Sequence, residues 1–162
     1  MHDLTDLSQQ LAKLLLNKQK YLAVAESCTG GWLAKCLTDI VGSSSWFERG
    51  FVTYSNASKR EMLGVAAHTL DANGAVSEAV VREMARGALA HSPADVAVAI
   101  SGIAGPGGGV PGKPVGTVCF AWEGTNEFSE LQTCHFDGDR DAVRRQSVEY
   151  ALHQLIQLLK HG

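Results

Sequence analysis

Three side chains of this sequence carry the groups needed to attack a carbonyl carbon and to move a proton: Ser27, Lys59 and Tyr54. The Ser27 hydroxyl is a candidate nucleophile, but a serine hydroxyl reacts poorly unless a neighbouring base takes its proton. Histidine is the usual base. The six histidines fall in terminal, loop or surface-helix contexts, although spacing alone does not exclude a distant pairing with Ser27. Lys59 is therefore the better candidate base.

Lys59 lies in the first turn of a short predicted helix, residues 56–63, which follows a predicted strand at 47–54. A protonated amine there meets the positive end of the helix dipole, and burial in a cleft also disfavours its charge. A neutral Lys59 would then accept the Ser27 proton. The Tyr54 hydroxyl, at the strand end, would position the lysine or relay a proton. The alternative is a solvated surface lysine.

Ser27 belongs to a turn, residues 26–31, between a predicted buried strand at 21–25 and a helix. Open α/β sheets bind ligands outside the carboxyl ends of their strands, and the amides at a helix start attract anions. Gly30 and Gly31 would let a ligand approach the backbone closely. The alternative is an ordinary helix N-cap formed by the serine or the threonine of this turn.

Cys28 is a second candidate nucleophile, because a thiol at a helix start can be acidified. It adjoins Ser27, so only one of the two side chains is expected to face a cleft. The alternative for Cys28 is a small buried apolar side chain.

A second glycine-rich loop, residues 101–109, also follows a predicted strand, residues 95–101. Two such loops at strand ends would form the two walls of one cleft, and the alternative is a flexible connector. Arg140, Arg144 and Arg145 start the last predicted helix, and one of them would contact a phosphate or a carboxylate. The alternative is a solvated, salt-bridged helix start, which is the preferred interpretation for Arg145.

Hydrophobic periodicity and turn residues predict the elements that position these side chains. Helices are predicted at 3–17, from 32, at 56–63, at 78–90 and from 139, and strands at 21–25, 47–54, 95–101, 117–123 and 128–136. Residues 64–75 are expected to form a loop with one weak turn, and Gly50 is a candidate bulge residue. Early alternation of helices and strands with a late hairpin predicts a three-layer α/β/α sandwich with a mixed β-sheet.

Length and composition narrow the classes of function. The 162 residues predict a single domain, residues 1–162. A net charge of −3 argues against wrapping of nucleic acid, and no apolar run reaches the roughly 18–20 residues that span a membrane. Without a signal-peptide pattern or a Cys-x-x-Cys pair, a cytoplasmic location is expected. Metal-ligand spacing of Cys and His is missing, so no metal is expected.

Six motifs occur in order along the chain: AESCTGG (25–31), GFVTYSN (50–56), GAVS (74–77), ISGIAGP (100–106), KPVGTV (113–118) and GDR (138–140). With this ordered set, the chain from about Leu7 to Leu159 resembles the CinA C-terminal domain family, the nicotinamide-nucleotide amidohydrolases. The resemblance implies an α/β/α sandwich. It also implies hydrolysis of the carboxamide of nicotinamide mononucleotide to nicotinic acid mononucleotide and ammonia, a step of pyridine nucleotide salvage.

The resemblance further implies a Ser–Lys mechanism with a nearby tyrosine, and these roles fall on Ser27, Lys59 and Tyr54. Members tend to self-associate, so a homo-oligomer is expected, and neither a metal nor an organic cofactor is required. The residues expected to bind the substrate are Thr29, Gly30, Gly31, Ser101, Gly102, Ala104, Gly105 and Arg140. Two alternatives stay open: a pyridine-nucleotide-binding module without catalysis, and a hydrolase that uses the Cys28 thiol.

Overall fold

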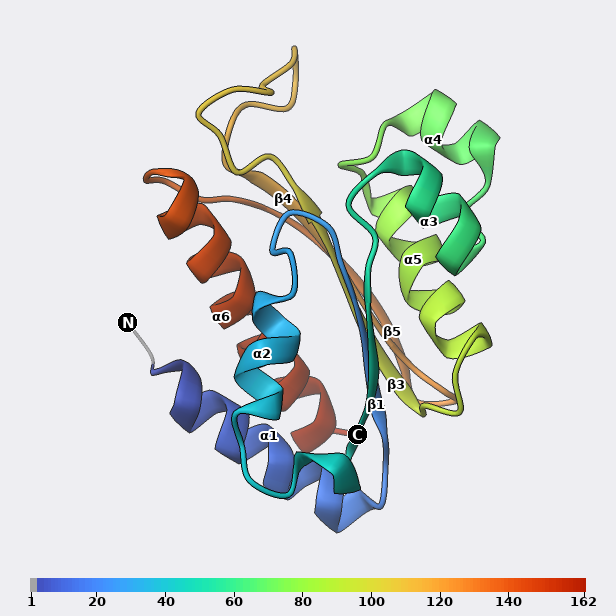
Figure 1. Cartoon of the computed structure of the whole chain (residues 1–162), viewed down its shortest axis with the longest axis vertical. Helices are drawn as coiled ribbons and strands as arrows, with labels where there is room; N and C mark the ends of the chain where they lie inside the picture. The colour runs from blue at the N-terminus through green and yellow to red at the C-terminus, as the bar shows by residue number, and fades with distance from the viewer. Residues whose placement is uncertain (1–2) are drawn as a thin grey trace.

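The computed structural model describes residues 3–162, whose helices and strands are shown in Figure 1. The helices are α1 (Leu4–Lys18), α2 (Trp32–Thr38), α3 (Asn56–Leu63), α4 (Ala67–Asn73), α5 (Glu78–Ala90) and α6 (Arg140–Lys160). The strands are β1 (Leu22–Glu26), β2 (Phe47–Val52), β3 (Val96–Gly102), β4 (Thr117–Gly124) and β5 (Phe128–His135). Among the helices described, none combines the length and the apolar character needed to span a bilayer.

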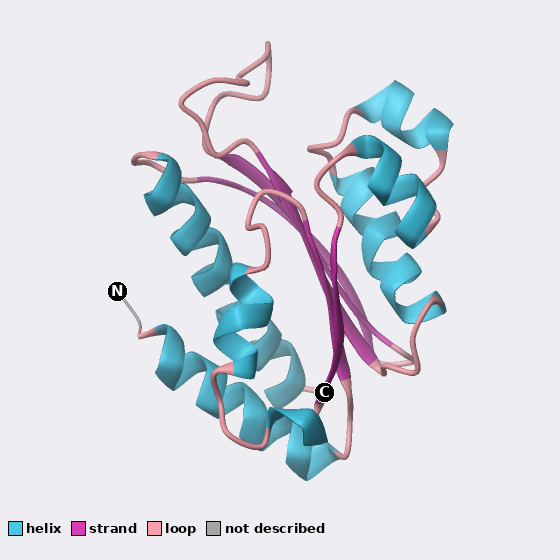
Figure 2. Cartoon of the chain, in the orientation of Figure 1, coloured by secondary structure: helices cyan, strands magenta, loops and turns pink. Residues whose placement is uncertain are grey.

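The strands form one mixed sheet in the order β2-β1-β3-β4-β5. β1 runs parallel to both β2 and β3, whereas β4 runs antiparallel to β3 and β5. Helices α1, α2 and α6 cover one face of the sheet, and α3, α4 and α5 cover the other (Figure 2). The predicted three-layer sandwich with a mixed sheet is confirmed. Because β1, β2 and β3 are parallel, their carboxyl ends meet at one edge of the sheet.

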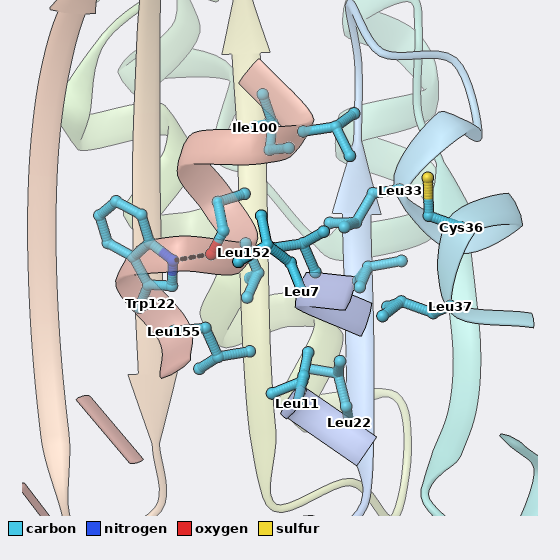
Figure 3. Close-up of a cluster of buried hydrophobic side chains, with 14 of the residues drawn as sticks. Leu7, Leu11, Leu22, Leu33, Cys36, Leu37, Ile100, Trp122, Leu152 and Leu155 are labelled. Carbon is cyan, nitrogen blue, oxygen red and sulfur yellow. Dashed lines mark hydrogen bonds between the residues drawn. The ribbon is translucent and has the colours of Figure 1, made fainter. Parts of the chain in front are cut away.

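The central strands are buried on both faces, and their alternating side chains separate two apolar cores. Leu22 points into the core under α1, α2 and α6 (Figure 3). In this core the Trp122 Nε1 donates to the Ala151 carbonyl at 3.2 Å, which ties α6 to β4. Ala23 and Ala25 face α5 together with other alanines of the sheet. Their small side chains let α5 pack directly on the sheet.

Residues 67–73 form helix α4, where the sequence predicted a loop with one weak turn. The N-cap residue, Ala66, supplies no capping side chain. Instead, the Glu83 carboxylate of α5 accepts hydrogen bonds from the Ala66 N–H at 2.8 Å and from the Thr69 hydroxyl at 2.6 Å. Because this cap comes from a residue 17 positions away, no local pattern indicates the start of the helix.

The edge strand β2 differs in two details from the prediction. The β1–β2 register skips Glu48, so the bulge does not lie at Gly50. Gly50 pairs in register with Val24, and a Cβ at Gly50 would lie 3.2 Å from the Val24 Cγ2. Its missing side chain therefore serves close packing. The strand also ends at Val52 rather than at Tyr54.

Candidate active site

The carboxyl ends of the parallel strands bring several predicted site residues together. Ser27 follows β1, Tyr54 follows β2, and Ser101 lies at the end of β3. A cavity of about 220 Å³ lies at this edge of the sheet. Its walls come from both glycine-rich loops and from elements on both faces: Ser27, Cys28, Tyr54, Lys59, Ala75, Val76, Ser101, Gly102, Ala104 and Arg140. A larger hollow of about 440 Å³ around the β4–β5 turn is lined by none of the predicted site residues.

Lys59 of α3 contacts Ser27 directly. The Lys59 Nζ lies 3.0 Å from the Ser27 Oγ and 3.0 Å from the backbone carbonyl oxygens of Thr53 and Tyr54. The Ser55 side chain caps the start of α3, which fixes the helix that carries the lysine. The nucleophile and base candidates therefore lie within hydrogen-bond distance of each other.

The surroundings of the Lys59 amine favour its neutral form. The residue is 1% exposed, and burial lowers the pKa of Lys59 from its ordinary value of 10.5. None of the ion pairs among the described residues includes Lys59. A neutral amine has two N–H donors and one lone pair. When the Thr53 and Tyr54 carbonyls accept the two N–H groups, the lone pair is left to accept the proton of the Ser27 hydroxyl.

Backbone hydrogen bonds hold the two segments in register beyond the strand ends. The Ser27 N–H donates to the Ile100 carbonyl at 3.0 Å, which continues the β1–β3 pairing. The Thr53 N–H donates to the Glu26 carbonyl at 2.8 Å, which continues the β1–β2 pairing. The position of the serine relative to the lysine-bearing segment is thus set by the sheet itself.

The buried Glu26 carboxylate fixes the turn that follows Ser27. It accepts from the N–H groups of Leu33 at 2.9 Å and Ala34 at 3.1 Å, in the first turn of α2, and from the Thr29 hydroxyl at 2.6 Å. The N-cap residue of α2 is Gly31, which has no capping side chain, so Glu26 supplies the cap. No local pattern in the sequence indicates this role, because Glu26 lies outside the spacing of local capping motifs.

Arg140 bridges two segments of the cavity wall. Its Nη1 donates to the Gly105 carbonyl at 2.9 Å, and its Nη2 donates to the Tyr54 hydroxyl at 3.3 Å. The Tyr54 side chain is exposed, and the group of this residue that contacts Lys59 is the backbone carbonyl. The predicted contact between the Tyr54 hydroxyl and the lysine is therefore replaced by a contact with Arg140.

The other two arginines of α6 have separate partners. Arg144 donates from Nε to the Cys28 carbonyl at 3.0 Å and from Nη2 to the Thr29 carbonyl at 3.2 Å. Arg145 forms an ion pair with Glu149 at 3.1 Å, in agreement with the salt-bridged interpretation. From the sequence, Arg145 is interpreted as salt-bridged and Arg140 as a substrate contact, whereas Arg144 has no separate role.

The residues predicted to bind substrate divide into two groups. The cavity is lined by Ser101, Gly102, Ala104 and Arg140, but not by Thr29, Gly30, Gly31 and Gly105. The Ser101 hydroxyl donates to the Ala75 carbonyl at 2.9 Å, which ties β3 to the segment before α5. A Cβ at Gly30 would lie 3.4 Å from the Arg144 Nη2, so this glycine faces the arginine. Of the turn after Ser27, Cys28 thus lines the cavity, whereas Thr29, Gly30 and Gly31 do not.

Cys28 has the properties of a buried apolar residue. Burial raises the pKa of its thiol to about 12, so the thiol is neutral at pH 7 and a poor nucleophile. Ser27, its neighbour, has its hydroxyl against Lys59. No histidine of residues 3–162 lines the cavity. Of the alternatives from the sequence, the geometry favours the serine with the lysine.

Known proteins similar to this chain share both its sequence and its fold. The sequence profile of the CinA C-terminal domain matches residues 4–159. The nicotinamide-nucleotide amidohydrolase PncC of Escherichia coli K12 is 56% identical over 155 residues, covering 96% of this chain and 94% of that protein. The Pseudomonas putida protein of the same name is 52% identical over 159 residues, 98% of each chain. The crystal structure of the competence damage-inducible protein A from Klebsiella pneumoniae matches with a TM-score of 0.95 at 42% identity over 99% of both chains. The chain therefore belongs to the CinA C-terminal domain family.

Proposed function

We propose that the protein hydrolyses the carboxamide of nicotinamide mononucleotide to nicotinic acid mononucleotide and ammonia by a Ser–Lys mechanism. The observation that carries the proposal is the 3.0 Å contact between the buried Lys59 Nζ and the Ser27 Oγ. The relatives named nicotinamide-nucleotide amidohydrolase support the substrate class. This reaction suits pyridine nucleotide salvage, because it converts the amide form of the nucleotide to the acid form.

In the first half-reaction, the neutral Lys59 amine takes the proton of the Ser27 hydroxyl as the Oγ attacks the carboxamide carbon. A C–O bond forms, and the carbonyl oxygen becomes an oxyanion. Lys59, now an ammonium, donates its proton to the amide nitrogen. The C–N bond then breaks, ammonia leaves, and an ester joins the nicotinoyl group to Ser27.

In the second half-reaction, water attacks the ester carbon while Lys59 takes one of its protons. The tetrahedral intermediate collapses with cleavage of the bond to the Ser27 Oγ. Lys59 returns the proton to that oxygen, which restores the neutral amine and the hydroxyl. The net reaction consumes one water and converts the carboxamide to the carboxylic acid and ammonia, which in solution become a carboxylate and ammonium.

The charges of the cavity orient the nucleotide. Lys59 is buried in the wall, whereas Arg140 is exposed. With the carboxamide against Ser27, the phosphate extends toward Arg140. A guanidinium binds phosphate oxygens with two parallel donors, which is the contact that this side chain offers to the substrate. Ser101, Gly102 and Ala104 also line this cavity.

A coupled assay of ammonia release tests the proposal. We expect turnover of nicotinamide mononucleotide by the wild-type protein and little or none of nicotinamide riboside, nicotinamide or NAD. Ser27→Ala should abolish turnover without changing the circular dichroism spectrum. Saturable binding of the nucleotide without ammonia release would instead identify a binding module, and full activity of Ser27→Ala would exclude the serine mechanism.

Self-association, a cytoplasmic location and a single domain over residues 1–162 stay predictions. Light scattering on the purified protein checks self-association. We expect a molar mass that is a multiple of the mass of one chain, and a monomer at the assay concentration would contradict it.

A further inference from the structure

The backbone amide of Cys28 is held next to the proposed nucleophile by the chain itself. Its nitrogen is bonded to the carbonyl carbon of Ser27, so standard bond lengths keep it within about 5 Å of the Ser27 Oγ. Ser27 and Cys28 both line the cavity. An oxyanion on a carbon atom that is bonded to the Ser27 Oγ therefore forms close to this amide.

The turn after Ser27 directs the Cys28 amide hydrogen outward. The Ser27 carbonyl accepts a hydrogen bond from the Gly30 N–H at 3.1 Å, which closes a turn over residues 27–30. The peptide between Ser27 and Cys28 is planar and trans, so the Cys28 N–H points away from that carbonyl and out of the turn. No oxygen atom of residues 3–162 accepts a hydrogen bond from it.

Two amide hydrogens lie beside the Cys28 sulfur. Burial raises the pKa of the Cys28 thiol to about 12, and the N–H groups of Cys28 and Gly102 oppose this rise by hydrogen bonding to the sulfur. Gly102 lies at the end of β3 and lines the cavity. The Cys28 N–H is therefore directed toward the part of the cavity wall that Gly102 forms. A thiol sulfur is a weak acceptor, so a charged oxygen can replace it.

The other amides of this turn do not offer the same donor. The Ser27 N–H donates to the Ile100 carbonyl at 3.0 Å, and the Gly30 N–H is used within the turn. Thr29 is fully buried and does not line the cavity. Within the turn, the Cys28 amide therefore combines a donor that lacks a strong acceptor with a place in the cavity wall.

We propose that the Cys28 N–H donates a hydrogen bond to the oxyanion that forms when Ser27 attacks the carboxamide carbon. This inference rests on the proposed function. The carboxamide oxygen gains negative charge as the C–O bond to Ser27 forms, so the hydrogen bond strengthens in the transition state. The donor belongs to the backbone, and the turn fixes its direction before the substrate binds. Little reorganisation is then needed when the charge develops.

The test removes the amide hydrogen and leaves the side chain constant. Cys28→Ala keeps the N–H and serves as the reference. Lactic acid, the α-hydroxy counterpart of alanine, is introduced at position 28 by nonsense suppression and replaces that N–H with an ester oxygen. Because loss of one oxyanion donor costs about 100- to 1,000-fold, we expect the ester variant to have a kcat about 100-fold below that of Cys28→Ala, with little change in KM.

Two further measurements separate the donor from a general effect of a backbone ester. Glycolic acid in place of the exposed Gly107 introduces the same ester bond away from the cavity and should leave kcat close to that of the wild type. The aldehyde counterpart of the carboxamide forms a tetrahedral adduct with a serine hydroxyl. Its affinity should fall in the position-28 ester in proportion to kcat, whereas a merely loosened turn would not produce this proportion.

Cys28→Pro removes the same hydrogen by a second route. Neither Cys28 nor Thr29 has a positive φ, which fits a type I turn over residues 27–30, and proline is favoured at the second position of such a turn. We therefore expect Cys28→Pro to fold, as circular dichroism can verify. Its kcat should be at least about 100-fold below that of Cys28→Ala.

Several results would overturn the inference. An ester variant with the kcat of Cys28→Ala would do so, as would a rise in KM with kcat unchanged. If the ester variant does not fold, Cys28→Pro decides: a folded protein with the kcat of Cys28→Ala contradicts the role. Loss of activity in Cys28→Ala itself would assign the contribution to the thiol instead. Absence of ammonia release by the wild type would overturn the proposed function and this inference together, whereas wild-type hydrolysis with a fully active ester would overturn the inference alone.

Discussion

Lys59 and Ser27 are 32 residues apart in the sequence, and their side-chain atoms lie 3.0 Å apart. They meet because β1 and β2 are parallel neighbours, so the segments that follow these strands leave the sheet side by side. The Thr53 N–H pairs with the Glu26 carbonyl just before the two segments separate. A slip of one residue in this pairing would turn the amine away from the hydroxyl. The sheet register therefore helps to set the contact between the amine and the hydroxyl.

Replacement of Lys59 by methionine should abolish most of the activity. The methionine side chain fills a similar space but cannot accept a proton, and a positioned general base contributes about 100- to 10,000-fold. We expect ammonia release from nicotinamide mononucleotide to fall by at least about 100-fold, with the nucleotide still bound. Isothermal titration with the variant checks binding. Residual activity within tenfold of the wild type would show that another group takes the serine proton.

The pH dependence of activity should follow the ionisation of Lys59. Burial lowers the pKa of Lys59 below 10.5, and the proposed mechanism requires the neutral amine. We therefore expect kcat/KM to rise with pH, with the midpoint of the ascending limb below 10.5. Activity is lost as the pH falls through the pKa of the folded protein. A profile that falls as pH rises toward 10 would contradict a neutral lysine base.

The same ionisation should appear in the stability of the fold. Between the lowered pKa of folded Lys59 and the ordinary value of 10.5, the unfolded chain binds more protons than the folded chain does. The free energy of unfolding then rises with pH through this window. Urea unfolding across this range should show a steeper rise for the wild type than for Lys59→Met. If stability rises equally with pH in the two proteins, the pKa of Lys59 is not lowered in the folded protein.

Removal of the Arg140 guanidinium should weaken binding of the phosphate without affecting the chemical step. A hydrogen bond between charged groups contributes about 1.5–3 kcal/mol, so Arg140→Ala should raise KM for nicotinamide mononucleotide by about 10- to 100-fold. The kcat should stay within about twofold. Binding of nicotinamide riboside, which lacks the phosphate, should be affected little when it is measured by isothermal titration. An equal loss for both compounds would show that Arg140 acts by joining Tyr54 to Gly105 instead.

Local signals in the sequence were sufficient to predict most of the helices and strands. The bounds of α3 and α5 match their predictions, because Ser55 and Ser77 cap them with side chains and Gly64 ends α3 with a positive φ of 71°. The alternation of buried strands and helices was likewise enough to predict the layers of the fold. The same pattern predicted that Ser27 directly follows one strand and that Lys59 lies in the helix after the next strand.

Contacts between remote segments could not be read from the sequence in the same way. Glu83 caps α4 and Glu26 caps α2 from other elements, so neither helix start shows a local cap. Arg140 and Arg144 have different partners because their side chains reach different loops. Arg140 donates to the Gly105 carbonyl, and Arg144 donates to the Cys28 carbonyl. Such roles depend on tertiary packing, which single-sequence spacing does not encode.

Replacement of Glu26 by glutamine should loosen the turn that holds the nucleophile. A glutamine offers one acceptor oxygen, so one of the Leu33 and Ala34 N–H groups loses its partner. An unpaired buried donor costs about 1–3 kcal/mol. We expect urea unfolding to show a loss of that size, with a lower kcat. The control is Asp39→Asn, which breaks the exposed Lys35–Asp39 pair on the same helix and should change stability by less than about 0.5 kcal/mol. Equal effects of the two substitutions would contradict the capping role.

Gly87→Ala should damage both the fold and the site, although alanine is the better helix former. In an ordinary helix interior this substitution stabilises by about 1 kcal/mol. At Gly87 of α5, however, the new Cβ would overlap the Leu63 carbonyl oxygen, at the end of the helix that carries Lys59. Overpacking of this kind typically costs about 1–3 kcal/mol. We expect a lower free energy of unfolding in urea and a kcat reduced by about 10-fold, because α3 must shift away from α5 and carry the amine with it. Gly107→Ala, where nothing lies within 4 Å of the added Cβ, should change neither quantity by much. A Gly87→Ala protein as stable and active as the wild type would show that the spacing of α3 and α5 does not set the position of Lys59.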